Sequence, residues 1–278
     1  ASAAYMAKMI LKDEGIHVPF ITTLHGTDIT LVGRDASFEP VITFSINNSD
    51  AATAVSQSLK EDTLKYFNIK RKIEVIPNFI NIREYDIEIN ESLRSYYAPE
   101  KEKIICHTSN FRKVKRIEDV VQVFASVQKE IPAKLLLVGD GPERHSIEKL
   151  CDDLKITDNV IFLGKLRKTI DVLKISDLFL LTSETESFGL AALEAMAAGV
   201  PVISSNTGGI PEVNNNGVSG YLSNVGDVDE MSKNALFILK DENRLNEFKK
   251  NARLSALAFD ISKILPAYEN LYSSLLAK

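Results

Sequence analysis

Two glutamates eight residues apart form the chemically most informative pattern in the sequence. Glu186 lies in a loop after the apolar run 178–181, and Glu194 lies in the helix-like segment 189–198 that follows. A helix that starts after a strand points its free N–H groups and its positive dipole end toward the carboxyl edge of the sheet. The pattern predicts an anion site at this edge, although Glu194 taken alone also fits a solvated helical residue.

A second loop rich in glycine strengthens this prediction. Residues 206–213, Asn-Thr-Gly-Gly-Ile-Pro-Glu-Val, follow the next apolar run at 200–204. Loops that follow neighbouring parallel strands meet at one edge of the sheet and enclose a crevice there. We therefore expect a crevice that accepts a phosphorylated ligand.

The first 78 residues contain elements that alternate between strand and helix. Only about three strands are expected before residue 78, which is too few for a complete doubly wound sheet. Together with a helical start that lacks an initiator Met, this suggests that an upstream part of the first domain is missing. Helices are expected at 1–14, 37–47 and 56–67, and strands at 18–24, 51–55 and 73–76.

A complete second series follows a segment, 79–100, that has no periodicity and is typical of a linker. Six short apolar runs that alternate with helical patterns indicate a parallel sheet covered on both faces. The tail 228–277 is expected to be helical. The runs are 103–107, 133–138, 160–163, 178–181, 200–204 and 220–222, and the helical patterns are 116–129, 143–154, 167–175 and 189–198.

Composition excludes several other classes of protein. The net charge is −5, from 33 basic and 38 acidic residues mixed along the chain, which argues against a nucleic-acid or anionic membrane surface. No apolar run is long enough to span a bilayer and no signal peptide is evident, so a cytoplasmic location is expected. Cys106 and Cys151 lack metal-ligand spacing and are predicted to be reduced and buried.

The motifs above resemble glycosyltransferase family 4. The resemblance rests on the Glu186 to Glu194 spacing with Phe188-Gly189 inside it, and on the Gly-Gly-Ile-Pro-Glu loop at 208–212. It implies a retaining, UDP-sugar-dependent hexosyltransferase of the α/β GT-B fold, in which two Rossmann-like parallel-sheet domains face a cleft. The implied parts are a truncated first domain at 1–78, the linker at 79–100, a nucleotide-sugar domain at 101–260, and a C-terminal helix at 261–278 that packs back on the first domain.

The resemblance also implies roles for individual residues. Glu186 would bind hydroxyls of the transferred sugar, Glu194 the ribose hydroxyls, and the amides of Ser187, Phe188 and Gly189 the distal phosphate. Lys115 and Arg112 would stabilise the leaving diphosphate; the family's first cation falls at Asn110 here, so Arg112 is expected to replace it. A solvated basic loop is the alternative. His25, in Thr-Thr-Leu-His-Gly-Thr-Asp at 22–28, would orient the donor sugar, and Gly139, Gly141, Leu163 and Gly164 would complete the donor-binding set.

The segments 22–30 and 109–116 narrow the resemblance to a subgroup that transfers N-acetylglucosamine from UDP-N-acetylglucosamine to L-malate, the first step of bacillithiol biosynthesis. Thr22 and Thr23 would then contact the acceptor, although this subgroup has Arg where this chain has Ala51. Another family 4 acceptor and a non-catalytic UDP-sugar-binding fragment remain alternatives. No metal or other cofactor is expected, and a homo-oligomer fits the sequence as well as a monomer does.

Two further patterns have structural explanations. Gly139-Asp140-Gly141-Pro142 begins like a dinucleotide-binding fingerprint, but Arg144 stands where the third glycine would be, which argues against an oxidoreductase. Asp227-Val228-Asp229 imitates a metal-binding motif, but it directly precedes a helical pattern. Helix capping is therefore the expected role of Asp227.

Overall fold

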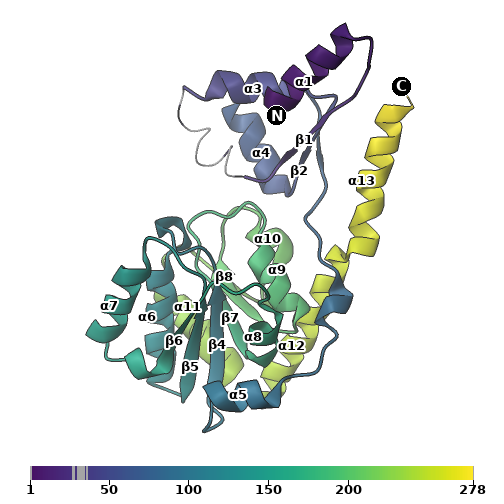
Figure 1. Cartoon of the computed structure of the whole chain (residues 1–278). Helices are drawn as coiled ribbons and strands as arrows, with labels where there is room; N and C mark the ends of the chain where they lie inside the picture. Colours follow the sequence, from purple (N-terminus) through teal and green to yellow (C-terminus); the bar gives the residue numbers. More distant parts are fainter. Residues whose placement is uncertain (1, 27–28, 30–34, 36, 278) are drawn as a thin grey trace. The chain divides into compact units, whose positions relative to one another are not determined.

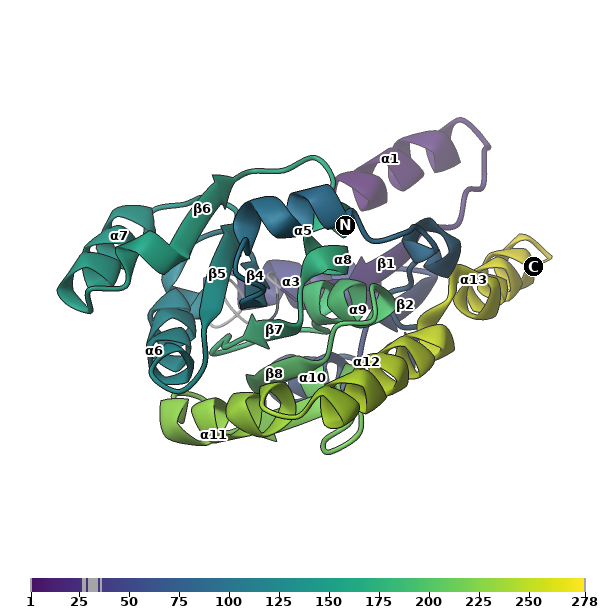
Figure 2. The same cartoon turned by 90° about the horizontal axis from the view of Figure 1, so that it is seen from below.

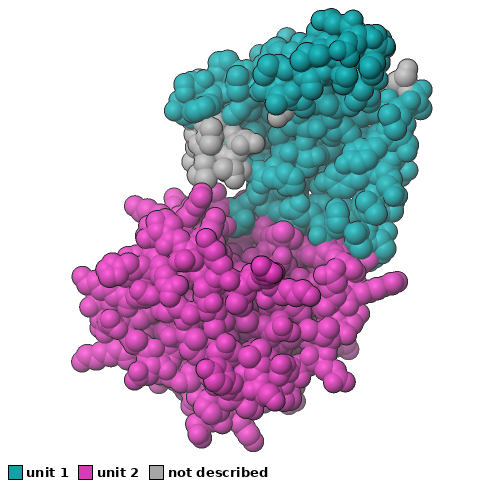
Figure 3. Space-filling model, in the orientation of Figure 1, with its two compact units in different colours: residues 1–79, 186–188, 261–278 teal, residues 80–185, 189–260 magenta. Residues whose placement is uncertain are grey.

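The computed structural model describes residues 2–26, 29, 35 and 37–277, and it divides into two compact units. The first unit comprises residues 1–79, 186–188 and 261–278, and the second comprises 80–185 and 189–260. Figures 1 and 3 show the elements and the two units. Both units contain parallel sheets with flanking helices, as expected of an α/β protein.

The first unit has a small parallel sheet with the strand order β1-β2-β3. The prediction of three strands here is confirmed for the described residues, but β1 is shorter than expected. Its first residues do not join the ladder, because the Phe20 N–H donates to the Asp50 carboxylate, 2.8 Å away. The elements are α1 (Ser2–Asp13), β1 (Ile21–Leu24), α3 (Glu39–Asn47), β2 (Ala51–Ala54), α4 (Gln57–Tyr66), β3 (Ile73–Val75) and α13 (Ile261–Leu276).

The segment 79–100, predicted as a linker, contains more structure than its sequence indicated. It forms the 3-10 helix η2 (Ile82–Tyr85) and the helix α5 (Glu91–Tyr97), which is capped by the Asn90 side chain. Ile82 and Tyr85 are buried. The segment is too short and polar for a periodic pattern, so its place within the second unit could not be predicted from the sequence.

The second unit has a six-stranded parallel sheet with the order β6-β5-β4-β7-β8-β9. All six strands were predicted, within two residues at each end. The expected strand 200–204 begins only at Val202, because Pro201 has no N–H to donate to the ladder. The strands are β4 (Lys103–Thr108), β5 (Ala133–Val138), β6 (Val160–Gly164), β7 (Leu178–Leu181), β8 (Val202–Ser205) and β9 (Gly220–Ser223).

Helices cover both faces of this sheet (Figure 2). Helices α6 and α11 pack against each other over one face, and α8 and α9 lie against β4, β7 and β8 on the other. Asp227 accepts a hydrogen bond from the Glu230 N–H, so its predicted capping role is confirmed. The helices are α6 (Ile117–Gln128), α7 (Arg144–Asp153), α8 (Ile170–Ile175), α9 (Leu190–Ala197), α10 (Ile210–Val213), α11 (Val228–Leu239) and α12 (Glu242–Ala256).

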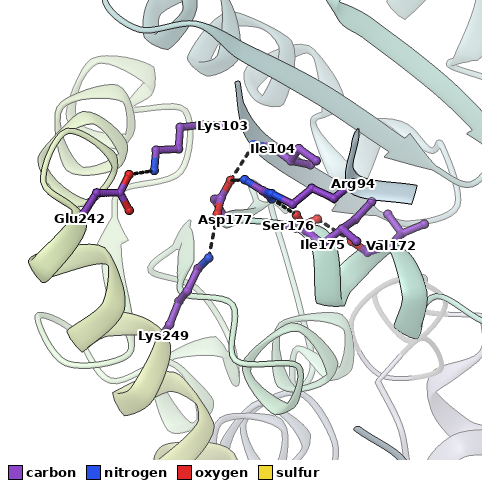
Figure 4. Close-up of polar contacts among 9 residues, drawn as sticks. All are labelled: Arg94, Lys103, Ile104, Val172, Ile175, Ser176, Asp177, Glu242 and Lys249. Atoms are coloured by element: carbon purple, nitrogen blue, oxygen red, sulfur yellow. Dashed lines mark hydrogen bonds and ion pairs between the residues drawn. The ribbon is translucent and has the colours of Figure 1, made fainter. Parts of the chain in front are cut away.

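A buried carboxylate joins three elements at the amino end of this sheet (Figure 4). Asp177 accepts from Arg94 of α5 at 2.8 Å, from Lys249 of α12 at 2.7 Å and from the backbone N–H of Ile104 at 2.9 Å. Burial alone would raise the pKa of Asp177, but Lys249, Arg94 and the Ile104 N–H outweigh burial and hold it below the usual value. The cluster therefore needs an ionised Asp177.

The two cysteines are free and buried, which confirms that prediction. Burial is the main cause that raises the thiol pKa of Cys106 to about 12 and that of Cys151 to about 11. Both thiols therefore stay protonated at neutral pH. No helix among the described residues is long and apolar enough to cross a bilayer.

Candidate active site

The strand order of the second unit changes direction between β4 and β7. From β4 the chain proceeds to β5 and β6 on one side, and then returns to β7, β8 and β9 on the other. Loops at such a switch point diverge and leave space beyond the carboxyl ends of the strands, where ligands bind in open α/β sheets. The basic loop 109–116 follows β4, and the loop that leads to Glu186 follows β7.

The basic loop is held against the end of β7. Residues Lys113–Lys115 form the 3-10 helix η3, and Arg116 follows in the left-handed conformation, with φ of 47°. The Glu184 N–H donates to the Val114 carbonyl at 2.8 Å. The buried Thr182 hydroxyl lies 2.8 Å from the Arg116 carbonyl oxygen and 3.1 Å from that of Lys115. Lys115 is half-buried, whereas Arg112 is exposed.

The loop after β4 is also joined to the loops after β5 and β6. The Phe111 N–H donates to the Asp140 carbonyl at 3.0 Å, and the Gly139 N–H donates to the Gly164 carbonyl at 2.8 Å. Gly139 has a φ of 128°, and a Cβ there would overlap the Ser109 carbonyl, so only glycine fits. The structure thus brings Gly139, Gly141 and Gly164 together with the basic loop, while Leu163 lies next to Gly164 within β6.

A buried histidine supports the same loop. The His107 Nδ1 lies 2.9 Å from the Leu180 carbonyl oxygen, and its Nε2 lies 2.7 Å from the Ser109 hydroxyl. Burial, helped by the nearby charge of Lys115, lowers the pKa of His107 to about 4, so the ring is neutral at neutral pH. Because a carbonyl only accepts, the proton sits on Nδ1, and Ser109 donates its hydroxyl hydrogen to Nε2.

Glu194 lies on α9, which begins directly after Gly189 in the left-handed conformation. The side chain is half-buried, so the fully solvated alternative does not describe it. Burial raises the pKa of Glu194. Burial also raises the pKa of the Tyr85 phenol, and the nearby charge of Glu194 adds to that shift. A partly buried carboxylate has lost hydrogen bonds to water, and ligand hydroxyls that donate to it replace them.

The first unit carries the remaining predicted residues. His25 is exposed after β1, and a Cβ on the next residue, Gly26, would overlap the Ser187 side chain, so the loop after β1 lies directly against Ser187. The Ser56 hydroxyl donates to the Ser187 carbonyl at 2.6 Å. This unit therefore brings His25 close to the Glu186–Phe188 segment. Residues 27, 28 and 30 of the same predicted motif lie outside the described residues.

The two predicted acceptor residues make hydrogen bonds to other residues of the first unit. The Thr22 and Ser49 hydroxyl oxygens lie 2.6 Å apart, and the Thr53 hydroxyl donates to that of Thr23 at 3.0 Å. As neighbours on one strand, Thr22 and Thr23 point to opposite faces of the sheet. At most one of them can therefore face a given acceptor molecule.

Sequence reasoning missed three residues of the candidate site. Ser56 stands before a helical pattern and signals an N-cap, which the structure confirms with a 3.0 Å bond from the Leu59 N–H. Its second partner, Ser187, is 131 residues away, and no local pattern could reveal it. Thr182 and His107 were passed over for the same reason, because their partners lie on neighbouring strands or loops. Among the described residues, no group of three or more His, Cys, Asp or Glu side chains could hold a metal ion.

Comparison with known proteins identifies the family and the fold. The family model for "Glycosyl transferases group 1" matches residues 88–255, and that for "Glycosyltransferase Family 4" matches residues 1–84. The chain belongs to these glycosyltransferases. Its fold is GT-B, and it is similar to the crystal structure of Anabaena HepE with UDP and glucose, with a TM-score of 0.86 at 22% identity over 98% of this chain and 74% of that chain.

Two curated relatives are closer in sequence. N-acetyl-alpha-D-glucosaminyl L-malate synthase of Bacillus anthracis is 46% identical over 278 residues, which is 99% of this chain and 72% of that protein. An uncharacterised glycosyltransferase of Methanocaldococcus jannaschii is 33% identical over 73% of this chain and 55% of its own length. The first of these relatives matches both units of this chain.

Proposed function

We propose that this glycosyltransferase transfers N-acetylglucosamine from UDP-N-acetylglucosamine to the hydroxyl group of L-malate, with retention of configuration. The observation that carries the proposal is the 46% identity to the Bacillus anthracis synthase across 99% of the chain. The matched region spans both units of the chain. The location would be cytoplasmic, where UDP-sugars are made.

The second unit supplies the proposed nucleotide site. Glu194 accepts hydrogen bonds from the ribose hydroxyls, and the glycine-lined edge formed by Gly139, Gly141 and Gly164, with Leu163, receives the uridine part. Lys115 and Arg112 stabilise the diphosphate as the glycosidic bond breaks and negative charge grows on the bridging oxygen. The support is that Arg112 and Lys115 follow β4, that the glycines and Leu163 lie at or just after the ends of β5 and β6, and that Glu194 lies on α9, the helix that follows β7.

The first unit supplies the proposed groups for the sugar and the acceptor. Glu186 binds hydroxyls of the transferred sugar, His25 orients it, and the amides of Ser187 and Phe188, with that of Gly189, hold the distal phosphate. Thr22 or Thr23 contacts the acceptor. The support is that the loop after β1 lies against Ser187. No nucleophile is assigned among the described residues, so the departing phosphate takes the acceptor proton as the acceptor hydroxyl attacks the anomeric carbon from the face that the phosphate leaves.

The test is an assay of UDP release from UDP-N-acetylglucosamine with and without L-malate, followed by NMR of the product. Malate-dependent release of UDP and an α-linked product are expected. If UDP release depends on a different acceptor, the malate assignment is wrong but the glycosyl transfer reaction stands. UDP binding without any turnover would leave a nucleotide-sugar-binding protein, and a β-linked product would exclude retention.

A further inference from the structure

We infer that Thr182 is a positioning residue that holds the cation Lys115 in place, an inference that rests on the function proposed above. Thr182 follows β7 and is completely buried. Its hydroxyl lies 2.8 Å from the carbonyl oxygen of Arg116 and 3.1 Å from that of Lys115, 66 and 67 residues away in sequence. One side chain thus binds the peptide group that follows the proposed cation.

The basic loop needs such an external contact because its own hydrogen bonds stabilise its backbone conformation only weakly. Lys113–Lys115 is a single 3-10 turn, which has poor hydrogen-bond geometry. Arg116 is left-handed, a conformation that residues with a side chain disfavour. Arg116 is held there by a bidentate pair with Asp119, at 2.6 and 3.0 Å, and by its carbonyl, which accepts from both Thr182 and the Asp119 N–H.

Fixing the backbone matters because the Lys115 side chain is long and flexible. A cation stabilises a leaving group best when it is already in place before charge develops, and a displacement of about 1 Å costs a large part of the rate. The bond from Thr182 transfers the rigidity of β7, whose four residues are all buried, to the carbonyl of Lys115. The Glu184 N–H bond to Val114 reinforces the same connection at 2.8 Å.

A purely structural threonine would behave differently from a positioning one. Loss of a structural hydroxyl lowers stability and leaves the kinetics of the remaining folded enzyme unchanged. Loss of a positioning hydroxyl lowers kcat in fully folded protein, and the loss depends on the group that is positioned. The two roles are therefore separable by kinetics at a temperature where every variant is folded.

The experiment compares Thr182→Val, which keeps the shape and removes the hydroxyl, with Thr182→Ser, which keeps the hydroxyl. Thr63→Val is the matched control, because Thr63 is also fully buried and donates to a backbone carbonyl, that of Leu59, at 2.7 Å. We expect Thr182→Val to lower kcat about tenfold, with UDP affinity changed less than about twofold, from the loss of one positioning hydrogen bond. Thr182→Ser and Thr63→Val are expected to keep kcat near wild type.

The Lys115→Ala background identifies the route of the effect. If Thr182 acts through Lys115, Thr182→Val lowers kcat in that background by less than about twofold. A wild-type kcat in Thr182→Val, no rescue by Ser, or an undiminished loss in the Lys115→Ala background would each overturn the inference. If Thr182→Val does not fold, Thr182→Cys replaces it, since a thiol is a weak donor of similar size.

The experiment also distinguishes a wrong role of Thr182 from a wrong proposed function. A wild-type enzyme that does not use malate shows no malate-dependent UDP release in any variant. The same comparison is then made on the slow hydrolysis of UDP-N-acetylglucosamine, which needs leaving-group stabilisation but no acceptor. Equal hydrolysis rates in wild type and Thr182→Val would overturn the role of Thr182 independently of the acceptor.

Discussion

The Ser56 hydroxyl donates to the Ser187 carbonyl at 2.6 Å while it accepts from the Leu59 N–H at 3.0 Å. One side chain therefore caps α4 and fixes the loop that carries Glu186. The hydroxyl is fully buried, so neither bond is replaced by water when it is removed.

Ser56→Ala is expected to lower the free energy of unfolding by about 1–2 kcal/mol from the lost cap, and to lower kcat because the Glu186–Phe188 segment loses its anchor. Denaturant unfolding and the UDP-release assay measure the two effects. Asn90→Ala removes another helix cap, the exposed one in which Asn90 accepts from the Leu93 N–H at the start of α5. If Asn90→Ala lowers kcat as much as Ser56→Ala does, the anchoring role is wrong.

Glu194→Gln is expected to raise the stability of the protein at neutral pH while it lowers the affinity for UDP. Burial raises the pKa of Glu194, so its contribution to stability is full below the ordinary glutamate pKa and is lost as pH rises through the raised value. The variant removes that loss and should be more stable than wild type at pH 7 in the absence of ligand. UDP affinity should fall about tenfold, because a neutral amide accepts more weakly from ribose.

Thermal unfolding from pH 4 to pH 8 and calorimetry with UDP test this prediction. The wild type should lose stability relative to the variant as pH rises. If the stabilities of wild type and variant change with pH in parallel, burial does not destabilise the ionised Glu194. If UDP affinity is unchanged, Glu194 does not bind the ribose. Glu212→Gln is a control at another glutamate of the same family motif, on the short helix α10.

Lys115→Ala is expected to lower kcat about 100-fold, the size found when one preorganised charge-stabilising group is removed. UDP affinity should change less, because most of the charge on the bridging oxygen appears as the bond breaks. Lys113→Ala, two residues earlier and exposed, is the matched control and should retain wild-type kinetics. Equal losses in the two variants would favour a solvated basic loop over a specific cation.

The free energy of unfolding should fall in two separate pH ranges as the solution is acidified. The pKa of His107 is lowered by burial to about 4, so the stability it contributes is present above about pH 6.5 and is lost as pH falls toward 4. The pKa of Asp177 also lies below its usual value, so its contribution is lost only at still lower pH. Imidazole ¹⁵N spectra should show a neutral, Nδ1-protonated His107 at pH 6, and an imidazolium signal there would contradict the assignment.

Asp177→Asn should abolish the loss of stability in the lower of the two pH ranges, because that loss is assigned to protonation of Asp177. It should also destabilise the protein at neutral pH. The expected loss is about 2–3 kcal/mol, less than for a fully buried pair, because Arg94 and Lys249 are partly exposed and can reach water. Denaturant unfolding at pH 7 and pH 3 measures it. Glu130→Gln, which breaks the exposed pair with Lys240, should unfold at the wild-type midpoint.

The sequence predicted the parallel sheet of the second unit because its strands are short, apolar and separated by helical patterns. The roles predicted for Glu194, Lys115 and the glycine loops rest on signals that are local in sequence, and they stay predictions. Hydrogen bonds between distant segments leave no such signal. The bonds of Thr182 to the basic loop and of Ser56 to Ser187 therefore required the structure, as did the helix α5, which is stabilised by the contact of Arg94 with Asp177.

The first unit is discontinuous, since its residues come from 1–79, 186–188 and 261–278. The hydroxyl of Tyr268, in α13, donates to the Ile76 carbonyl at 3.4 Å, and the Phe79 and Tyr268 rings pack edge to face. Residues 261–278 complete the first unit, so a premature stop before residue 261 would remove α13 together with its contacts to Ile76 and Phe79, and would leave one side of the first unit uncovered.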